Sequence, residues 1–181
     1  MTWRMRNNIK FYPINQCALY KCSSKKKLAS LLNSNLAELK DLAINIDKNY
    51  YNFYQDKKGT TDKRKIAAPE EELKRLQKRV LSLLKKIEKP DWVMSSTLEK
   101  SYIDNAKYHL DASYFCKTDV KQFYDNCKRE RVYRFFKDKL LTAPDIAKLL
   151  TDLVTINLKI PTGAPSSQLI AYFAYEDMFH S

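Results

Sequence analysis

Glycine is rare in this sequence: 181 residues contain only two, Gly59 and Gly163. A β protein rich in tight turns needs more positions with positive φ, and a loop that cradles phosphate needs several glycines close together. The sequence therefore excludes P-loop and Rossmann nucleotide-binding folds. We expect each of the two glycines to mark a place where the backbone needs unusual freedom.

Most of the remaining pattern is helical. Apolar residues make up 44% of the chain, enough for a packed core, and in several segments they recur at helical spacing. Two short helices are predicted after Ser23-Ser24, with a break at Asn33-Ser34-Asn35; further helices are predicted from Pro69 to Pro90 and over 101–110, 131–141, 145–158 and 166–179. Strands are predicted over 50–54, 63–68 and 114–120, the last of them buried. The expected fold class is a helix-rich α+β protein.

The charge is strongly positive. The formal net charge is +12 and the isoelectric point is near 9.4. Residues 56–90 alone hold 12 basic and 6 acidic side chains. Such an excess is typical of proteins that bind nucleic acid, although a lysine-rich surface also serves solubility. No run of 18 apolar residues and no leader-like apolar segment is present, so we expect no membrane partner.

The cysteines give no metal pattern. Their spacing matches no zinc motif, and the two histidines are not placed to complete one; these residues are Cys17, Cys22, Cys116, Cys127, His109 and His180. We interpret the cysteines as buried, reduced thiols of a cytoplasmic protein.

Asp119 is the acid of greatest interest, because it ends the predicted buried strand. An unpaired buried carboxylate is costly, so the side chain is expected to be a helix cap, an ion-pair partner or a metal ligand. The residue alone leaves these three alternatives open. The aromatic pair Phe123-Tyr124 follows it by four and five residues.

Four motifs in a fixed order carry a family resemblance. They are Arg64-x-Ile66-x-x-Pro69 with Leu73-Lys74 and Gln77, then Ser101-Tyr102-Ile103-x-Asn105-Ala106-x-x-His109, then Thr118-Asp119-Val120-Lys121-x-Phe123-Tyr124, and last Pro161-x-Gly163-Ala164-Pro165-x-Ser167. Taken together they resemble the two fingers motifs and palm motifs A and B of retron-like and defence-associated bacterial reverse transcriptases, relatives of the group II intron enzymes. The resemblance covers residues 24–181.

The resemblance implies the fingers and the first part of a right-hand polymerase palm. The implied division is an N-terminal helical region at 1–49, fingers at 50–113 and a partial palm at 114–181. Such polymerases use two Mg²⁺ ions for nucleotidyl transfer. Asp119 would bind both ions, helped by the carbonyl of Val120.

The resemblance also implies contacts to nucleotide and nucleic acid. Lys63 or Lys65, together with Arg64, would hold the incoming triphosphate. Tyr124, beside Phe123, would be the steric gate against a 2′-hydroxyl. Gly163 would let the backbone approach the nucleotide, next to Thr162. Nucleic acid would contact Lys74, Arg75, Lys78, Asn105 and His109; for Asn105 and His109, structural hydrogen bonding is an equal alternative.

The sequence departs from the family in three places and lacks one motif. Thr162 stands where glutamine is common, Gln168 where proline is usual, and Ala171-Tyr172 where Ser-Asn is frequent. No Tyr-x-Asp-Asp hairpin of motif C and no thumb is present, and Glu176-Asp177 is interpreted as a surface pair. We therefore expect an N-terminal fragment that is itself inactive.

The expected partners are an RNA template, a nucleic-acid primer and deoxynucleoside triphosphates, with a dedicated non-coding RNA as a further candidate. The sequence leaves the oligomeric state open. Two alternatives remain: a non-catalytic nucleic-acid-binding module on a reverse-transcriptase scaffold, and a helical protein-interaction or toxin-like domain whose basic face serves solubility.

Overall fold

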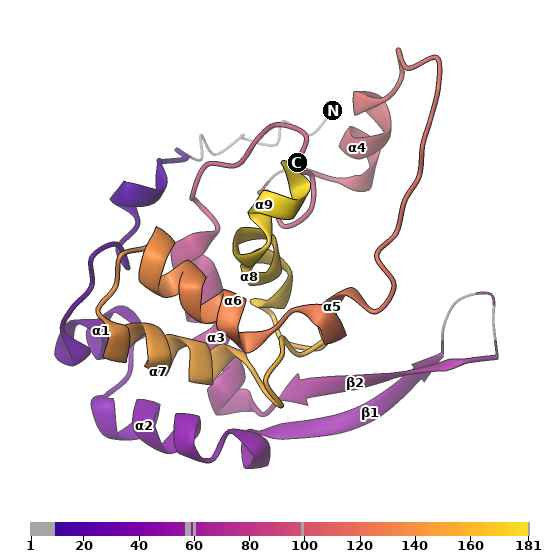
Figure 1. Ribbon diagram of the computed structural model, residues 1–181. Helices are drawn as coiled ribbons and strands as arrows, with labels where there is room; N and C mark the ends of the chain where they lie inside the picture. The colour runs from indigo at the N-terminus through magenta and orange to yellow at the C-terminus, as the bar shows by residue number, and fades with distance from the viewer. Residues whose placement is uncertain (1–9, 57–58, 60, 99, 181) are drawn as a thin grey trace, which may run out of the picture.

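The computed structural model describes residues 10–56, 59, 61–98 and 100–180. Within these ranges it is helix-rich with one two-stranded antiparallel sheet, which confirms the α+β class (Figure 1). In chain order the elements are η1 (Ile14–Gln16), α1 (Lys25–Leu31), α2 (Leu36–Ile44), η2 (Ile46–Asn49), β1 (Tyr50–Asp56), β2 (Lys63–Pro69), α3 (Glu71–Leu84), α4 (Tyr102–Tyr108), α5 (Phe123–Asn126), α6 (Arg129–Arg134), η3 (Phe135–Lys139), α7 (Pro144–Val154), α8 (Ser167–Ala174) and α9 (Glu176–Phe179). Here η1 and η2 are 3₁₀ helices, and η3 is a π-helical continuation of α6.

The first two α-helices begin at side-chain caps, and the first begins directly after Ser24, as predicted. The Ser24 hydroxyl accepts a hydrogen bond from the Lys27 N–H at 3.3 Å, and the Asn35 side chain accepts one from the Glu38 N–H at 2.9 Å. Between the helices, Asn33 adopts a positive φ of 53°, a conformation that asparagine tolerates well. The predicted break therefore separates α1 from α2.

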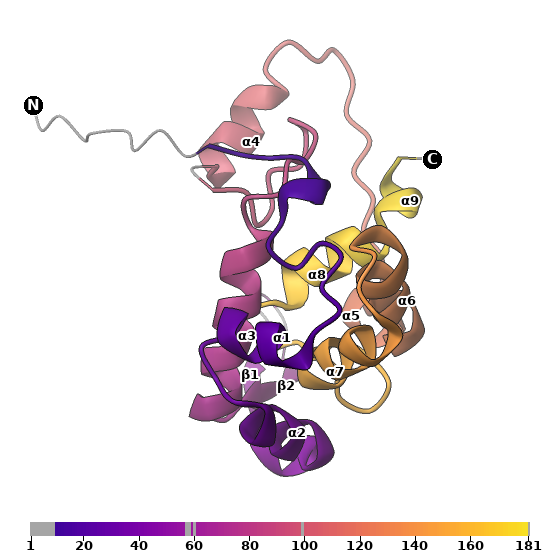
Figure 2. The same cartoon turned by 90° about the vertical axis from the view of Figure 1, so that its left-hand side faces the viewer.

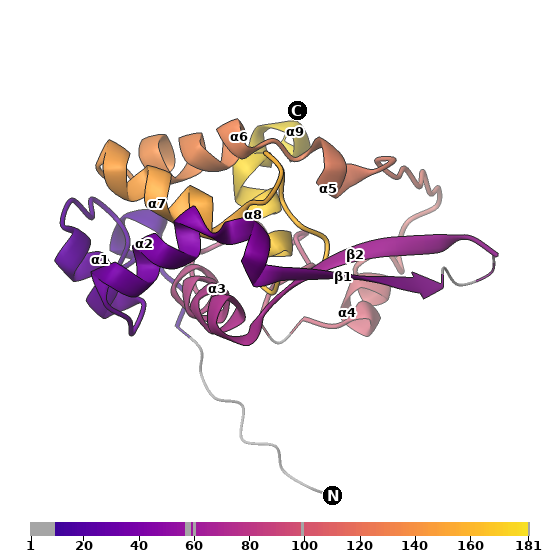
Figure 3. The same ribbon diagram turned by 90° about the horizontal axis from the view of Figure 1, so that it is seen from below.

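β1 and β2 form a long hairpin that projects from the helical body (Figure 3). The pairing runs from Tyr50↔Pro69 to Asp56↔Lys63. The predicted aromatic strand is confirmed, but only Tyr50 at its base is buried, whereas Phe53 is 41% and Tyr54 67% exposed. The outer parts of β1 and β2 therefore lie away from the hydrophobic core.

α3 shows the predicted amphipathic stripe. Its buried residues are Leu73, Leu76, Gln77, Val80, Leu83 and Leu84. Two details of the prediction were wrong: Pro69 ends β2 rather than opening the helix, and the helix stops at Leu84 rather than at Pro90. The chain turns after Leu84 because the backbone of Lys86 and Glu88 pairs with Tyr12 in the N-terminal segment.

The C-terminal helices complete a continuous core. α2 packs on α7, and α6 packs on both α7 and α8. The rings of Phe135 and Phe173 stack in parallel with centroids 5.3 Å apart. The core includes buried residues from Cys17 to Ala174, so it draws on all three regions of the predicted division. That division, part of which lies outside the described residues, stays a prediction.

One sequence expectation fails clearly. Residues 114–120 were predicted as a buried strand, but they lie in an extended, exposed segment between α4 and α5; the side chain of Tyr114 is 94% exposed and that of Phe115 is 73% exposed. A strand needs a neighbour for its backbone hydrogen bonds. Among the described residues only β1 and β2 pair in a named sheet, so this apolar segment has neither a ladder nor a layer to cover it.

α4 also stands apart from the helical body (Figure 2). The helix predicted over 101–110 is present, and it begins with a reciprocal cap in which Ser101 and Asp104 bond each other's backbone N–H, but none of its residues is buried. None of the helices in the described ranges has the length and apolar character needed to cross a bilayer. Residues 1–9, on which the expectation about a leader also rests, lie outside the described part of the chain.

Gln77 gives a test of the core. It is 1% exposed, and its amide nitrogen donates to the Tyr50 hydroxyl at 2.7 Å and to the Leu153 carbonyl at 2.9 Å, which joins α3 to β1 and α7. Gln77→Ala is expected to lower the free energy of unfolding by about 2–4 kcal/mol, because it leaves a cavity and a buried carbonyl without its donor. Chemical denaturation measures this loss, and Lys78→Ala on the exposed face should change it by less than about 0.5 kcal/mol. Equal losses in the free energy of unfolding for the two substitutions would contradict the structural role of the buried Gln77 side chain.

Thiol labelling tests the exposure of residues 113–120. Cys116 lies exposed in this segment, contrary to the expectation of a buried thiol, whereas Cys17, Cys22 and Cys127 are buried. Burial also raises the pKa of the Cys127 thiol to about 11 and raises that of Cys17, which suppresses their reactive thiolates. One thiol should react rapidly with a disulfide reagent at pH 8, and Cys116→Ser should abolish that phase. If no thiol reacts before unfolding, the segment is buried after all.

Candidate functional site

The basic residues of β2 lie at the outer half of the hairpin. Lys63, Arg64 and Lys65 are all exposed. Side chains alternate between the two faces of a strand, so Arg64 points to one face and both lysines to the other. The cross-strand partner of Arg64 is Gln55, and that of Lys65 is Tyr54. The structure therefore does not bring the three cations to one face, and a phosphate held by Arg64 would meet a lysine only around the strand edge.

The inner half of β2 meets the loop at 161–165. The Gly163 N–H donates to the Ala67 carbonyl at 3.0 Å, and the Ala67 N–H donates to the Thr162 hydroxyl at 3.4 Å. A Cβ on Gly163 would lie 2.5 Å from the Ala67 oxygen and 2.7 Å from the Ile66 Cγ2. Gly163 is therefore required for close packing on β2, while its predicted approach to a nucleotide stays a prediction.

The helix after this loop differs from the expectation in two ways. Ser166 precedes α8 but makes no capping bond, and its buried hydroxyl has no hydrogen-bond partner among the described residues. Ser167 instead donates to the Pro161 carbonyl at 2.6 Å, which closes the loop on itself. The predicted single helix to Phe179 is interrupted at Tyr175, so α8 and α9 are separate.

The aromatic pair of α5 is anchored on this C-terminal end. The Phe123 ring lies edge-on to those of Tyr175 and Phe179, with centroids 6.2 and 6.1 Å away. Tyr124 is half-buried beside Phe123, and burial raises the pKa of its phenol. Gln122, just before α5, has a positive φ of 53°. The pair predicted to face the nucleotide sugar is thus held by residues some fifty positions later.

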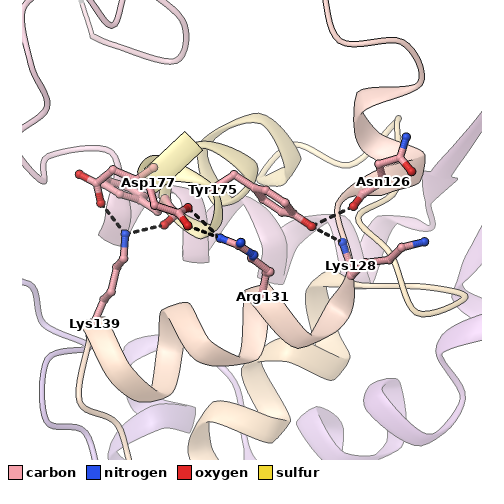
Figure 4. Close-up of polar contacts among 8 residues, drawn as sticks. Asn126, Lys128, Arg131, Lys139, Tyr175 and Asp177 are labelled. Atoms are coloured by element: carbon pink, nitrogen blue, oxygen red, sulfur yellow. Dashed lines mark hydrogen bonds and ion pairs between the residues drawn. The ribbon is translucent and has the colours of Figure 1, made fainter. Parts of the chain in front are cut away.

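A polar network fixes the junction of α5 and α6 (Figure 4). The Tyr175 hydroxyl accepts a hydrogen bond from the Lys128 N–H at 2.7 Å and donates one to the Asn126 carbonyl at 2.8 Å. The Arg131 guanidinium lies 5.0 Å above the Tyr175 ring and bonds both Asp177 oxygens, at 2.7 and 2.6 Å. The hydrogen bond from Arg131 holds the pKa of the Asp177 carboxyl below its usual value.

Sequence reasoning missed this network. It treated Glu176-Asp177 as a surface pair, and the exposure of Asp177 agrees with that, but both acids bind cations of α6 and η3, since Lys139 bonds Glu176 at 2.5 Å. The partners of Arg131 and Tyr175 are 46 to 49 residues away. No local spacing rule links residues so far apart.

The predicted metal ligand is isolated. Asp119 is exposed in the extended segment, and the following Val120 is 48% exposed. In the part of the chain that the structure describes, no three His, Cys, Asp or Glu side chains gather in a way that could hold a metal ion. The residues present do not fit a two-ion magnesium site, because one carboxylate and one backbone carbonyl leave most of the oxygen ligands unsupplied.

The predicted nucleic-acid residues fall into two groups. On α3, Arg75 donates to the Asn33 carbonyl at 2.9 Å and pairs with Glu38, so its guanidinium holds the turn between α1 and α2. Lys74 lies 3.6 Å from Glu71, and Lys78 is exposed. Asn105 and His109 are exposed at α4, where the His109 ring contacts those of Tyr108 and Phe115. The structure does not bring the α3 and α4 groups together in a single site.

Comparison with known proteins gives two informative relatives. No protein-family profile matches the chain. The retron Se72 reverse transcriptase of Salmonella heidelberg is 27% identical over 150 residues, which cover 82% of this chain and 40% of that protein. The retron Ec48 reverse transcriptase of Escherichia coli is 30% identical over 79 residues, which cover 44% of this chain and 19% of that protein. The chain thus matches less than half the length of either relative.

Gly163 provides a test of the contact between the loop and β2. Gly163→Ala should lower the free energy of unfolding by about 1–3 kcal/mol, because the new Cβ overlaps the Ala67 carbonyl and either the loop or the strand must move. Hydrogen exchange should show faster exchange at the amides of residues 163 and 67. Thr162→Val, which removes only a long hydrogen bond, should cost less than about 1 kcal/mol. Unchanged protection in Gly163→Ala would show that the loop does not rest on β2.

Proposed function

We propose that this chain, which is homologous to retron reverse transcriptases, supplies the fingers and the first part of the palm of an RNA-directed DNA polymerase. The observation that carries the proposal is the similarity to a retron reverse transcriptase over 82% of the chain. The matched part of that relative is 40% of its length, so we assign the complete reaction to a longer protein and expect the 181 residues alone not to polymerise. Its setting is a retron or phage-defence system.

In this proposal Asp119 is one carboxylate of the metal site, with the Val120 carbonyl beside it. The described residues gather no group of three possible metal ligands, so the remaining ligands of the two Mg²⁺ ions are assigned to residues outside them. The exposure of 113–120 supports this assignment, since an apolar segment that ends in an acid is left without any covering layer. Covering it with further chain would bury Tyr114 and Phe115 while keeping the carboxylate at an edge.

The nucleotide site in this proposal lies between the hairpin and α5. Arg64 binds the triphosphate together with Lys63 or Lys65, as a planar guanidinium suits phosphate oxygens. Tyr124 restricts the sugar, and its packing on Phe123, whose ring in turn contacts that of Tyr175, supports a fixed position for such a gate. The hydrogen bonds of Ala67, from the Gly163 N–H and to the Thr162 hydroxyl, support placing both motifs at one site.

The proposed partners are an RNA template, a primer and deoxynucleoside triphosphates, in the cytoplasm, with a non-coding RNA as a further candidate. Lys74, Lys78, Asn105 and His109 are the proposed nucleic-acid contacts. Arg75 is a weaker candidate than the sequence suggests, because its guanidinium already pairs with Glu38. A non-catalytic nucleic-acid-binding module is the second candidate function, and the isolation of Asp119 is the observation that favours it.

Primer extension by the complete gene product tests the proposal. With an RNA template, a DNA primer and Mg²⁺, we expect extension by the wild type. Asp119→Ala should reduce the rate by at least two to three orders of magnitude, because a metal carboxylate supplies several kcal/mol of transition-state stabilisation. The 181-residue chain should give none.

Asp111→Ala is the matched control, since Asp111 is another exposed acid of the segment before α5. It should leave extension unchanged. A complete gene product that binds RNA but extends no primer would favour the non-catalytic module, and equal losses in both variants would argue against a metal role for Asp119.

A further inference from the structure

An open, polar surface hollow, called the cavity below, lies between α4, the loop that precedes it and α8. Its volume is about 330 Å³, at the lower end of the roughly 300–1,000 Å³ of sites that take small ligands. The residues that line it are Met94, Ser95, Ser96, Lys100, Ser101, Tyr102, Asn105 and Gln168. Most of these side chains are polar or charged, so the cavity is unsuited to an apolar peptide or a lipid chain.

One wall of the cavity is held by side-chain hydrogen bonds between α8 and the loop. The Gln168 amide of α8 donates to the Ser95 hydroxyl and accepts from the Ser96 hydroxyl at 2.7 Å. The Ser96 carbonyl accepts a hydrogen bond from the Lys89 ammonium at 2.6 Å. Gln168 therefore ties the loop to the core, which gives a physical role to a glutamine that stands where the related polymerases usually have proline.

The opposite side carries groups that are left for a ligand. Within the described residues, neither the Lys100 ammonium nor the Asn105 amide has a hydrogen-bond partner. The Tyr102 side chain is 84% exposed at the rim. These groups are a cation, a donor–acceptor amide and an aromatic ring, which match the phosphate, the base edge and the base face of a nucleotide.

Among the described residues, the charge of the acid on the same helix turn is partly offset. Asp104 is the acid of the same helix turn, and its carboxylate is occupied by the N–H and hydroxyl of Ser101 at 2.8 and 2.6 Å. Besides these hydrogen bonds, Lys100 and Lys107 lower the pKa of the Asp104 carboxyl, so both lysines offset its charge. With a net charge of +12 on the whole chain, a polyanion is the ligand class that the surroundings favour.

We propose that this cavity binds one nucleotide unit of single-stranded nucleic acid: Lys100 contacts the phosphate, Asn105 the base edge, and the Tyr102 ring the base. The inference rests on the proposed function, because it takes nucleic acid as the partner. It goes further in identifying a surface site that does not include Asp119, in assigning Lys100 and Tyr102 to it, and in giving Gln168 the role of a positioning residue. A free mononucleotide offers the same chemistry as a strand, so the experiment must separate the two.

The test is binding of fluorescein-labelled oligouridine RNA to the 181-residue chain, followed by anisotropy at several salt concentrations. Tyr102→Leu keeps helix propensity and apolar size but removes the ring, and it should weaken binding roughly 5- to 150-fold, the range measured for loss of one base–aromatic stack. Lys100→Ala should reduce the slope of log affinity against log salt by about 0.7, the value for one phosphate contact on a single strand. Gln168→Ala should weaken RNA binding because the loop loses its hydrogen bonds to α8, although the residues proposed to contact the RNA are unchanged.

Lys40→Ala is the matched control, because Lys40 is an exposed lysine on α2, far from α4 in Figure 1. Lys40→Ala should not change the part of the RNA affinity that comes from the Tyr102 ring and the Asn105 amide. Circular dichroism should show that every variant keeps its helix content. An RNA with an abasic site should bind wild type and Tyr102→Leu equally. Competition with uridine monophosphate separates free nucleotide from strand. If it displaces the RNA from wild type but not from Tyr102→Leu, the site binds free nucleotide. If it does not displace the RNA, the site binds the strand.

Two outcomes would overturn the inference, and they are distinguishable. If the wild type binds RNA and the three cavity variants bind it with unchanged affinity and salt slope, the cavity is not a nucleotide site, whereas the proposed function stands. If the wild type does not bind RNA even at low salt, the nucleic-acid surface proposed for this chain fails as well.

Discussion

The close approach of Gly163 to the backbone of Ala67 is the constraint on which the arrangement of the site depends. The hairpin projects from the body and has few buried side chains, so its orientation is fixed at its base. There β2 bonds to β1 along one edge, and Ala67 bonds to Thr162 and Gly163 on the other. Any side chain at position 163 would push the loop away from β2. This movement would also separate α8, which follows the loop, from the cations of the hairpin.

Much of the fold follows from local sequence rules. The start of α1 after Ser24, the break before α2, the helix after Ser101 and the stripe of α3 were predicted, because each depends on residues within a few positions of one another. The boundaries of α3 and α8 were less accurate, since they depend on contacts with Tyr12 and Phe123 from distant parts of the chain. The family resemblance was confirmed by the two retron relatives.

The site was less predictable than the fold. The run 114–120 has the composition of a buried strand, but burial needs a second layer and a neighbouring strand, which no sequence window contains. The same reason explains why Arg75 was assigned to nucleic acid while the structure pairs it with Glu38. A basic residue on a helix looks the same in sequence whether its charge meets solvent, ligand or another helix.

The Tyr175 network also bears on when the site can form. Its hydrogen bonds to Lys128 and Asn126 join residues 47 and 49 positions apart, and Arg131 reaches Asp177 across 46. Contacts of such separation carry a loop-closure cost that local helices do not, so they form after the helices themselves. On the ribosome, α5 cannot acquire its final orientation until the chain beyond α8 has emerged. The Phe123-Tyr124 pair is therefore among the last parts of this chain to be ordered, although it lies more than fifty residues before the end.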